Sequence, residues 1–380
     1  MSPKGKRLRR ALKIGGLSLL VLLALLLLPL VGVAVECRVF SQSEIAAPQI
    51  SPERQALRTE LIDYANNIRQ EEQTYLTLPE WYIVFSADEY AAFIRQSPPS
   101  QFPYFRAIAQ YWRTYYRVCG LTRDEYAFNG RYHTILAVIG VSFTVENVIK
   151  GVYENSVGRL TEWLGGGEAT EEDAYAAQVA TAYGDFIHTI PWFEFPFAEA
   201  FSGLWTETSL WGPNFIRKGE RKFALSLEYG GKALYGRLIK GGNEASFEPV
   251  DVEMYLWLAG LSDEVLQQEP EMELVSRLDD ESAVVIVPRY EAFTQLTPRL
   301  VEQGVRFLEI AGNDEIMLTV LAPATWAHDD LPAGTLLFEM PVLSQPERQR
   351  IAVRVPVREL HLLLAGLDEA GLQLEHIYDY

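Results

Sequence analysis

The feature that most constrains this chain is a run of 22 residues, 14–35, that contains no charged side chain. It follows a basic head in which six of the first 13 residues are lysine or arginine. At about 1.5 Å per residue, a helix over this run is roughly 33 Å long, enough to cross a hydrocarbon core of about 30 Å. The sequence therefore predicts a single transmembrane signal-anchor helix over residues 14–35.

The basic head also predicts the orientation of this helix. Positive charge is retained on the cytoplasmic side, so residues 1–13 are expected inside and the rest of the chain outside. The expected location is a bacterial inner membrane, with the body facing the periplasm. A cleaved signal peptide remains an alternative because Gly32 and Ala34 are small, although such peptides have apolar cores of about 7–15 residues. Lipid modification of Cys37 is a second alternative, which the preceding Glu36 disfavours.

The charge of the remaining chain excludes one class of partner. Six of the 33 lysines and arginines lie in the head, which leaves 27 against 51 acidic residues, a net charge of −24. Such a surface repels phosphate, so we expect no binding of DNA or RNA. The predicted partner is the lipid bilayer, through residues 14–35, and a protein partner is left open. Cys37 and Cys119 could form a disulfide in an oxidising compartment, but their spacing alone does not decide this.

Helical periodicity dominates the first part of the body. After a linker over 36–52, we expect an all-α extracytoplasmic domain over 53–262. One helix should run from Pro52 to about residue 73, with a break at 77–81 around Pro79 and a new helix capped by Ser86 and Glu89. Further helices are expected over 103–118, from a cap at Thr170, and over 221–240.

The last part of the chain, 263–380, has a different period. Short alternating stretches predict strands at 283–287, 305–310, 315–321, 335–340, 351–355 and 372–378. Two helices between them share a template, with Pro288 and Pro356 at their starts and Gly304 and Gly371 after their ends. Proline at the start and glycine at the end of a helix are typical of strand–helix–strand units. The predicted fold class is α+β, ending in a sandwich with an internal βαβ duplication.

An apolar helix over 131–155 is predicted to be a buried core helix of the helical domain. Its apolar stretch is too short to span a bilayer, and Glu146 and Lys150 follow it. These two residues are spaced to pair along the helix. Ala137, Gly140 and Thr144 give it a small-residue face that another helix can approach closely.

An aromatic tract at 183–215, followed by basic residues, suggests a second membrane contact. Tryptophan favours the membrane boundary and cations favour anionic headgroups. The predicted interface residues are Trp192, Phe193, Phe195, Trp205, Trp211, Arg217 and Lys218. An aromatic core edge with a solvated basic helix start is the alternative.

The sequence contains no recognisable catalytic or metal-binding motif. Motifs of zinc proteases, redox dithiols, EF-hands and α/β-hydrolases are all absent from the printed sequence, and we expect no metal and no cofactor. A polar pocket in the helical domain is the one enzymatic hypothesis, built from Arg131, His133, Glu146, Lys150, Asp185 and His188. The sequence favours a non-catalytic binding or scaffolding role at the membrane surface, with a cell-envelope enzyme as the alternative.

Overall fold

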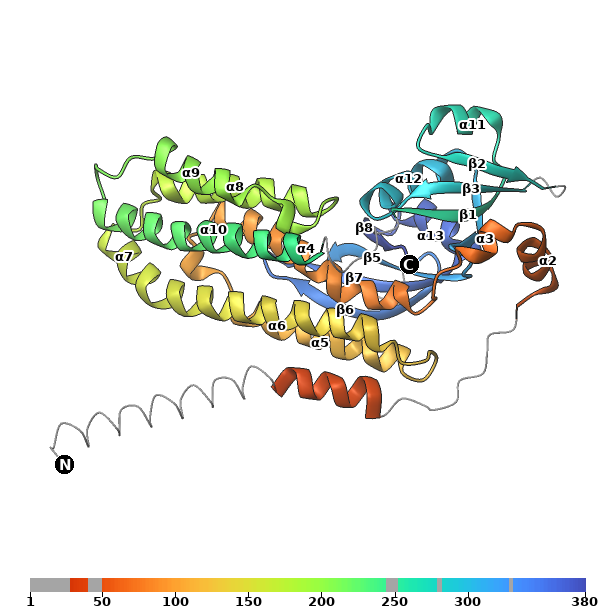
Figure 1. The fold of residues 1–380 in the computed structure, drawn as a ribbon, viewed down its shortest axis with the longest axis horizontal. Coiled ribbons are helices and arrows are strands. Elements are labelled where there is room, and N and C mark those ends of the chain that lie inside the picture. The colour runs from red at the N-terminus through yellow and green to blue at the C-terminus, as the bar shows by residue number, and fades with distance from the viewer. Residues whose placement is uncertain (1–27, 40–49, 244–251, 279–281, 328–330) are drawn as a thin grey trace.

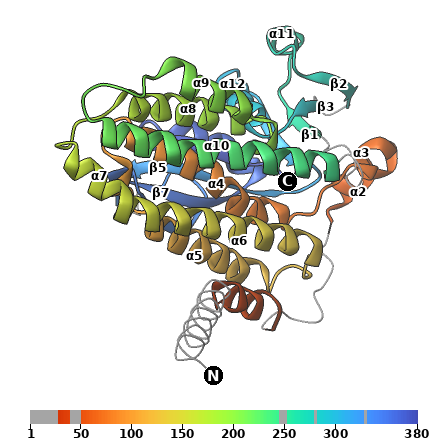
Figure 2. The same ribbon diagram turned by 60° about the vertical axis from the view of Figure 1, so that its left-hand side comes forward.

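The computed structural model describes residues 28–39, 50–243, 252–278, 282–327 and 331–380. The basic head, most of the expected anchor and most of the linker lie outside these ranges. Residues 28–34 are helical and continue into one π-helical turn, η1 (Val35–Val39). We call residues 28–39 the amino-terminal helix. It lies along α5 (Tyr104–Thr122) and α6 (Gly130–Tyr153), as both views show (Figure 1, Figure 2).

The first segments of the body differ from the expected helices. The helix predicted to run to residue 73 ends early, as α2 (Pro52–Glu60), and a short α3 (Ile62–Asn66) follows. The break predicted around Pro79 is wrong, because α4 (Gln73–Ile94) runs straight through it. Proline removes one backbone hydrogen bond, but α4 is buried on nearly all sides, so tertiary packing outweighs the local cost. The predicted cap at Ser86 is therefore an internal residue of α4.

The helical body agrees more closely with the sequence. It comprises η2 (Pro99–Gln101), α5, α6, η3 (Glu154–Gly158), α7 (Arg159–Leu164), α8 (Glu171–Ile187), η4 (Trp192–Glu194), α9 (Phe197–Glu207) and α10 (Phe215–Asn243). The cap at Thr170 is confirmed: its hydroxyl accepts the backbone N–H of Asp173, whose carboxylate accepts the backbone N–H of Thr170. The small-residue face of α6 is occupied by α5, because the Trp112 indole donates to the Thr144 hydroxyl at 2.8 Å.

The carboxyl-terminal part contains two antiparallel sheets with the same strand order. The first sheet, β2-β3-β1-β4, uses β1 (Glu253–Ala259), β2 (Glu273–Arg277), β3 (Ser282–Pro288) and β4 (Arg306–Ile310). The second, β6-β7-β5-β8, uses β5 (Glu315–Pro323), β6 (Thr335–Val342), β7 (Gln345–Pro356) and β8 (Gln373–Tyr378). The sheets order their second, third, first and fourth strands identically, so the structure repeats one unit twice.

The helices of these two units occupy equivalent positions. Between the third and fourth strands lie α12 (Glu291–Glu302) in the first unit, and η6 (Val357–Glu359) with α13 (Leu360–Gly366) in the second. The first unit has an additional helix, α11 (Asp263–Gln268). The six predicted strands are present. The strands β1 and β2 were not predicted, and β1 lies in the segment assigned to the helical domain.

The helical and α+β parts share hydrophobic cores. One core lies between the two sheets and is filled by α12 and α13. The other face of the second sheet packs on α4 and α5, whereas α2 and α3 cover the first sheet. Thr74 of α4 accepts the backbone N–H of Met317 at 2.9 Å and donates to the Tyr378 carbonyl at 2.7 Å. The central helix is therefore hydrogen-bonded directly to both β5 and β8.

Candidate functional site

The six polar residues predicted to form one pocket do not converge. Arg131 and Asp185 are exposed. The other four lie in three separate places: His133 beside the amino-terminal helix, Glu146 and Lys150 against α10, and His188 between α8, α4 and α12. An enzyme built on a shared pocket of these residues therefore has no geometric support.

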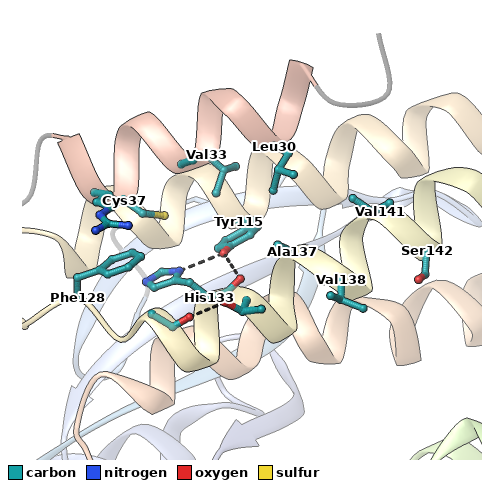
Figure 3. A pocket seen from close by; sticks show the side chains of 14 residues that line it. Leu30, Val33, Cys37, Tyr115, Phe128, His133, Ala137, Val138, Val141 and Ser142 are labelled. Atoms are coloured by element: carbon teal, nitrogen blue, oxygen red, sulfur yellow. Dashed lines mark hydrogen bonds between the residues drawn. The ribbon is translucent and has the colours of Figure 1, made fainter. Parts of the chain in front are cut away.

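His133 lies at the junction of α5, α6 and the amino-terminal helix. Its Nδ1 atom is 3.0 Å from the Tyr115 hydroxyl, and its ring stacks on Phe128 with a centroid distance of 4.6 Å. With Leu30 and Val33 it lines a cavity of about 510 Å³ whose walls are mainly apolar (Figure 3). This cavity suits an apolar occupant better than a charged substrate.

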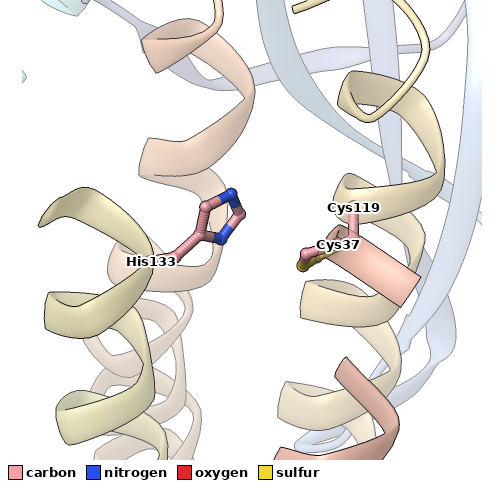
Figure 4. A group of neighbouring side chains, drawn as sticks. All are labelled: Cys37, Cys119 and His133. Atoms are coloured by element: carbon pink, nitrogen blue, oxygen red, sulfur yellow. A yellow bond between two sulfur atoms is a disulfide. The ribbon is translucent and has the colours of Figure 1, made fainter. Parts of the chain in front are cut away.

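The two cysteines meet at the same junction. Cys37 and Cys119 form a disulfide with a Cα–Cα distance of 4.8 Å, so the pairing that the sequence left open is present (Figure 4). One ring nitrogen of His133 lies within 4.8 Å of both sulfurs. A metal ion would need the two thiolates as ligands, and the disulfide removes them. The same turn is fixed by an ion pair between Glu36 and Arg123.

Glu146 and Lys150 belong to a network of four charges between α6 and α10. The predicted pairing along α6 is confirmed at 3.1 Å. Lys150 also contacts Glu228 at 2.6 Å, and Lys232 contacts Glu146 at 2.8 Å and Glu228 at 3.4 Å. Each of the four residues contacts an oppositely charged residue on both helices, so the network joins α6 to α10. Since these charges are paired with one another, they are not available to bind a substrate in a pocket.

His188 bridges two carboxylates whose meeting no local pattern predicts. Its Nε2 atom is 2.8 Å from Asp88 on α4, and its Nδ1 atom is 3.4 Å from Glu291 on α12. Hydrogen bonds to Asp88 and Glu291 raise the pKa of His188 to about 10. A group that stays protonated near neutral pH does not act as a general base there, so this bridge is a structural ion pair.

His376 lies next to this bridge. It is fully buried, its ring centroid is 3.5 Å from that of Trp81, and its Nδ1 atom is 3.1 Å from the Thr294 hydroxyl. Burial lowers the pKa of His376 to about 3, so the ring is neutral. The cluster therefore combines one fixed cation with one neutral ring where the helical and α+β parts meet.

A second cavity, of about 560 Å³, lies near α2 and β5 and is mainly acidic. Burial and the neighbouring Asp314 raise the pKa of Glu71 to about 7. Arg54 contacts Asp314 at 2.6 Å and also Glu309, so the acids here are partly neutralised by the protein itself.

The aromatic tract is partly exposed, whereas its basic residues are not. Trp211 is 77% exposed and Trp205 49%. Phe193 and Phe195 are half-buried, and Trp192 stacks on Tyr235 at 5.4 Å.

The basic residues of the tract are ion-paired inside the helical body. Arg217 contacts Asp173 at 3.2 Å and Glu220 at 2.9 Å, and Lys218 contacts Glu171 at 3.1 Å. These cations are therefore not available to headgroups as an exposed patch.

The apolar helix predicted to be buried is instead exposed along one side. Among the described residues, Gly130–Leu164 is the one helix long and apolar enough to cross a membrane, by length and composition alone. Only 28% of its most apolar stretch of 18 residues is buried in the protein. The expectation of a buried core helix is wrong for the outer side, where Val138, Ile149 and Val152 are each more than half exposed.

Comparisons with known proteins found no matching family model, no significantly similar curated protein and no significantly similar solved structure.

Proposed function

We propose that this protein is a membrane-anchored, non-catalytic binding or scaffolding protein of the bacterial inner membrane. Residues 14–35 anchor it, with the amino terminus in the cytoplasm and the acidic body in the periplasm. The acidic surface of the body is offered to a partner, and its net charge keeps it soluble.

The observation that carries this proposal is the way the end of the anchor is built into the body. Val33 and Cys37 of the amino-terminal helix are 3% and 4% exposed and belong to the core formed by α4, α5 and the second sheet. The disulfide to Cys119 adds a covalent link in a compartment where such bonds persist. A body fixed to its anchor in this way is held at a constant distance from the bilayer, which suits a scaffold.

Fractionation of the full chain tests the proposal. We expect the intact protein to stay in the membrane pellet after alkaline carbonate, and protease added to spheroplasts to digest the body while the head remains protected. The double variant Cys37→Ser/Cys119→Ser is the matched control, because it should stay in the pellet although the disulfide is lost. Release of the intact chain by carbonate, or protection of the body from external protease, would refute the proposal.

A further inference from the structure

The outer side of the helical body carries two long apolar stripes. On α6 and the segment that follows it, exposed positions recur every three or four residues, as expected for one helix face. The exposed apolar residues of this stripe are Ile135, Val138, Val145, Ile149, Val152, Val157, Leu160, Trp163 and Leu164. On α10 they are Phe215, Ile216, Phe223, Leu227, Leu234, Tyr235 and Leu238. Contiguous exposed apolar surface of this kind marks a contact with another apolar phase.

The charged residues of both helices avoid the middle of these stripes, whereas Arg159 and Arg237 are exposed toward their ends. Between Arg131 and Arg159, the charged side chains are Glu146, Lys150 and Glu154, and each is ion-paired with α10. Between Phe215 and Leu234, α10 carries seven charged residues, and all are paired inside the helical body: Arg217, Lys218, Glu220, Arg221, Lys222, Glu228 and Lys232. The most exposed of the inner charges, Glu146, has two lysine partners. Ionisable residues of membrane helices follow this rule, since they face the bundle interior and pair with one another.

The length and the ends of the stripe on α10 match a bilayer. Its part from Phe215 to Leu234, which ends before the exposed Arg237, extends over roughly 28 Å at about 1.5 Å per residue, close to a hydrocarbon core of about 30 Å. Near the start of α10 lie Trp163 and Trp211, which are 75% and 77% exposed. Near its end, Trp192 stacks on Tyr235. Aromatic residues at both ends of an apolar span are typical of the two membrane boundaries.

The amino-terminal helix gives the direction of these stripes relative to the anchor. Figure 3 shows Cys37 near His133 and Leu30 near Val141, so the amino-terminal helix runs antiparallel to α6. Contacts of Glu146 with Lys232 and of Lys150 with Glu228 show that α10 is antiparallel to α6 as well. A helix that leaves the bilayer at Cys37 therefore lies beside the start of α6, and α6 points back toward the bilayer.

From these relationships we infer that α6 and α10 enter the bilayer beside the anchor, with their outer stripes against lipid acyl chains. The inference rests on the proposed function, because it takes its direction from the anchor. It changes the membrane arrangement from a single helix to a group of helices. The lipid is the occupant that the structure favours, since the stripe of α6 adjoins the amino-terminal helix and the charges between Arg131 and Arg159 on α6 are ion-paired with α10.

Site-directed spin labelling of the full chain in liposomes tests the inference. Because both native cysteines form the disulfide, Ile135→Cys, Ile149→Cys, Leu160→Cys and Leu227→Cys each supply one free thiol for a nitroxide. Glu302→Cys, at an exposed position of α12, is the aqueous control. The nitroxide's collision rate with oxygen, which concentrates in the bilayer, is compared with its collision rate with a water-soluble nickel chelate. We expect the ratio of oxygen to nickel collisions to be highest at Ile149→Cys and Leu227→Cys. This ratio should be lower at Ile135→Cys and Leu160→Cys, where the helix approaches the two membrane boundaries.

The alternatives give different results. Accessibility equal to that of Glu302→Cys at all four positions, while the protein stays in the carbonate pellet, overturns the inference and leaves the proposed function intact. If all labelled positions of α6 lie at the same depth in the bilayer, the helix does not cross it, and the inference is overturned. If the spectra show spin–spin broadening that disappears on dilution with unlabelled protein, the stripes contact a second copy of the chain instead of lipid. Release of the intact chain by carbonate refutes the proposed function and the inference together. Quenching of the tryptophans by brominated lipids provides a check on the unmodified chain, and loss of this quenching contradicts lipid contact.

Discussion

The Nε2 atom of His188 lies 2.8 Å from the Oδ2 atom of Asp88, and this contact ties α8 to α4. Glu291 approaches the other ring nitrogen from α12, so a single imidazolium connects the helical body to the α+β part. Because this cation sits between two carboxylates, the stability of the connection depends on pH in a defined direction.

His188→Gln should remove a pH dependence of stability on the alkaline side. The pKa of His188 is raised to about 10 in the folded protein, against about 6.5 in the unfolded chain, so its contribution is complete below about pH 6.5 and is lost as the pH rises through 10. After allowance for partial solvent screening, we expect roughly 2 kcal/mol. Thermal unfolding in detergent at pH 6 and pH 9.5 measures the effect, and His361→Gln on α13 is the control. An unchanged slope in His188→Gln would contradict the assignment.

Arg350→Met should strongly destabilise the contact between α4 and the second sheet. The buried guanidinium lies 3.2 Å from Glu89 on α4 and 2.7 Å from Glu375 on β8. Removing it leaves two uncompensated carboxylates, and breaking a buried pair costs about 3–5 kcal/mol.

Chemical unfolding tests this cost. The triple variant Arg350→Met/Glu89→Gln/Glu375→Gln should recover part of the loss, because the orphaned charges are gone. If Arg350→Met is as stable as the parent protein, solvent must reach Glu89 and Glu375 and screen their charges.

Substituting alanine for two glycines should change the stability of the protein in opposite directions. A Cβ at Gly140 would lie 2.4 Å from Tyr111 Cε1 and 3.0 Å from Trp112 Cη2, so Gly140→Ala forces α5 and α6 apart. Overpacking of this kind costs about 1–3 kcal/mol. A Cβ added at Gly231, within α10, would meet no other side chain or element within 4 Å, and Gly231→Ala should stabilise by about 0.5–1 kcal/mol. Melting temperatures of the two variants compare them directly, and equal shifts would mean that the close helix approach is absent.

Loss of the disulfide should loosen the amino-terminal helix without releasing the protein from the membrane. The bond closes a loop with a sequence separation of 82 residues, and loops of this size contribute about 4 kcal/mol by restricting the unfolded chain. Hydrogen exchange of residues 28–39 should increase in Cys37→Ser. Exchange that stays as slow as in the parent protein would indicate that packing alone holds this helix.

Val145→Lys should show whether the outer stripe of α6 contacts lipid or water. A lysine placed in the middle of a membrane helix costs about 2.5–3.5 kcal/mol, whereas exposed surface substitutions usually stay within about 0.5 kcal/mol. Leu362→Lys, at an exposed position of α13, is the control. Yield in the membrane fraction and melting temperature in detergent provide the comparison. Equal behaviour of the two variants would place Val145 in water.

The sequence predicted the repeated α+β unit because its signals are local. A proline and a glycine at the positions of Pro356 and Gly371 mark the start and the end of a short helix through local backbone preferences alone. Strands such as β8 alternate polar and apolar residues, which gives a clear period. β1 was missed because a short apolar run does not distinguish a strand from a buried helix. The helix through Pro79 was missed because burial of α4 is a tertiary effect that the local pattern opposes.

The candidate sites were less predictable for a geometric reason. His188 was identified, but Asp88 and Glu291 are each at least 100 residues away in sequence, and nothing local indicates that they meet. The basic residues after the aromatic tract resemble a headgroup-binding patch in sequence. Their acidic partners, such as Asp173 and Glu154, belong to other helices, so the pairing becomes visible only in the fold.

The hydrogen bond from Thr74 to Tyr378 has a consequence for synthesis. The two residues are 304 positions apart. At about 5–20 residues per second, the ribosome needs roughly 15–60 s to complete β8 after α4 has been made. During that interval the apolar sides of the central helix have no sheet to cover them. Folding of this chain should therefore depend on chaperones that hold newly made segments until the last strand is complete.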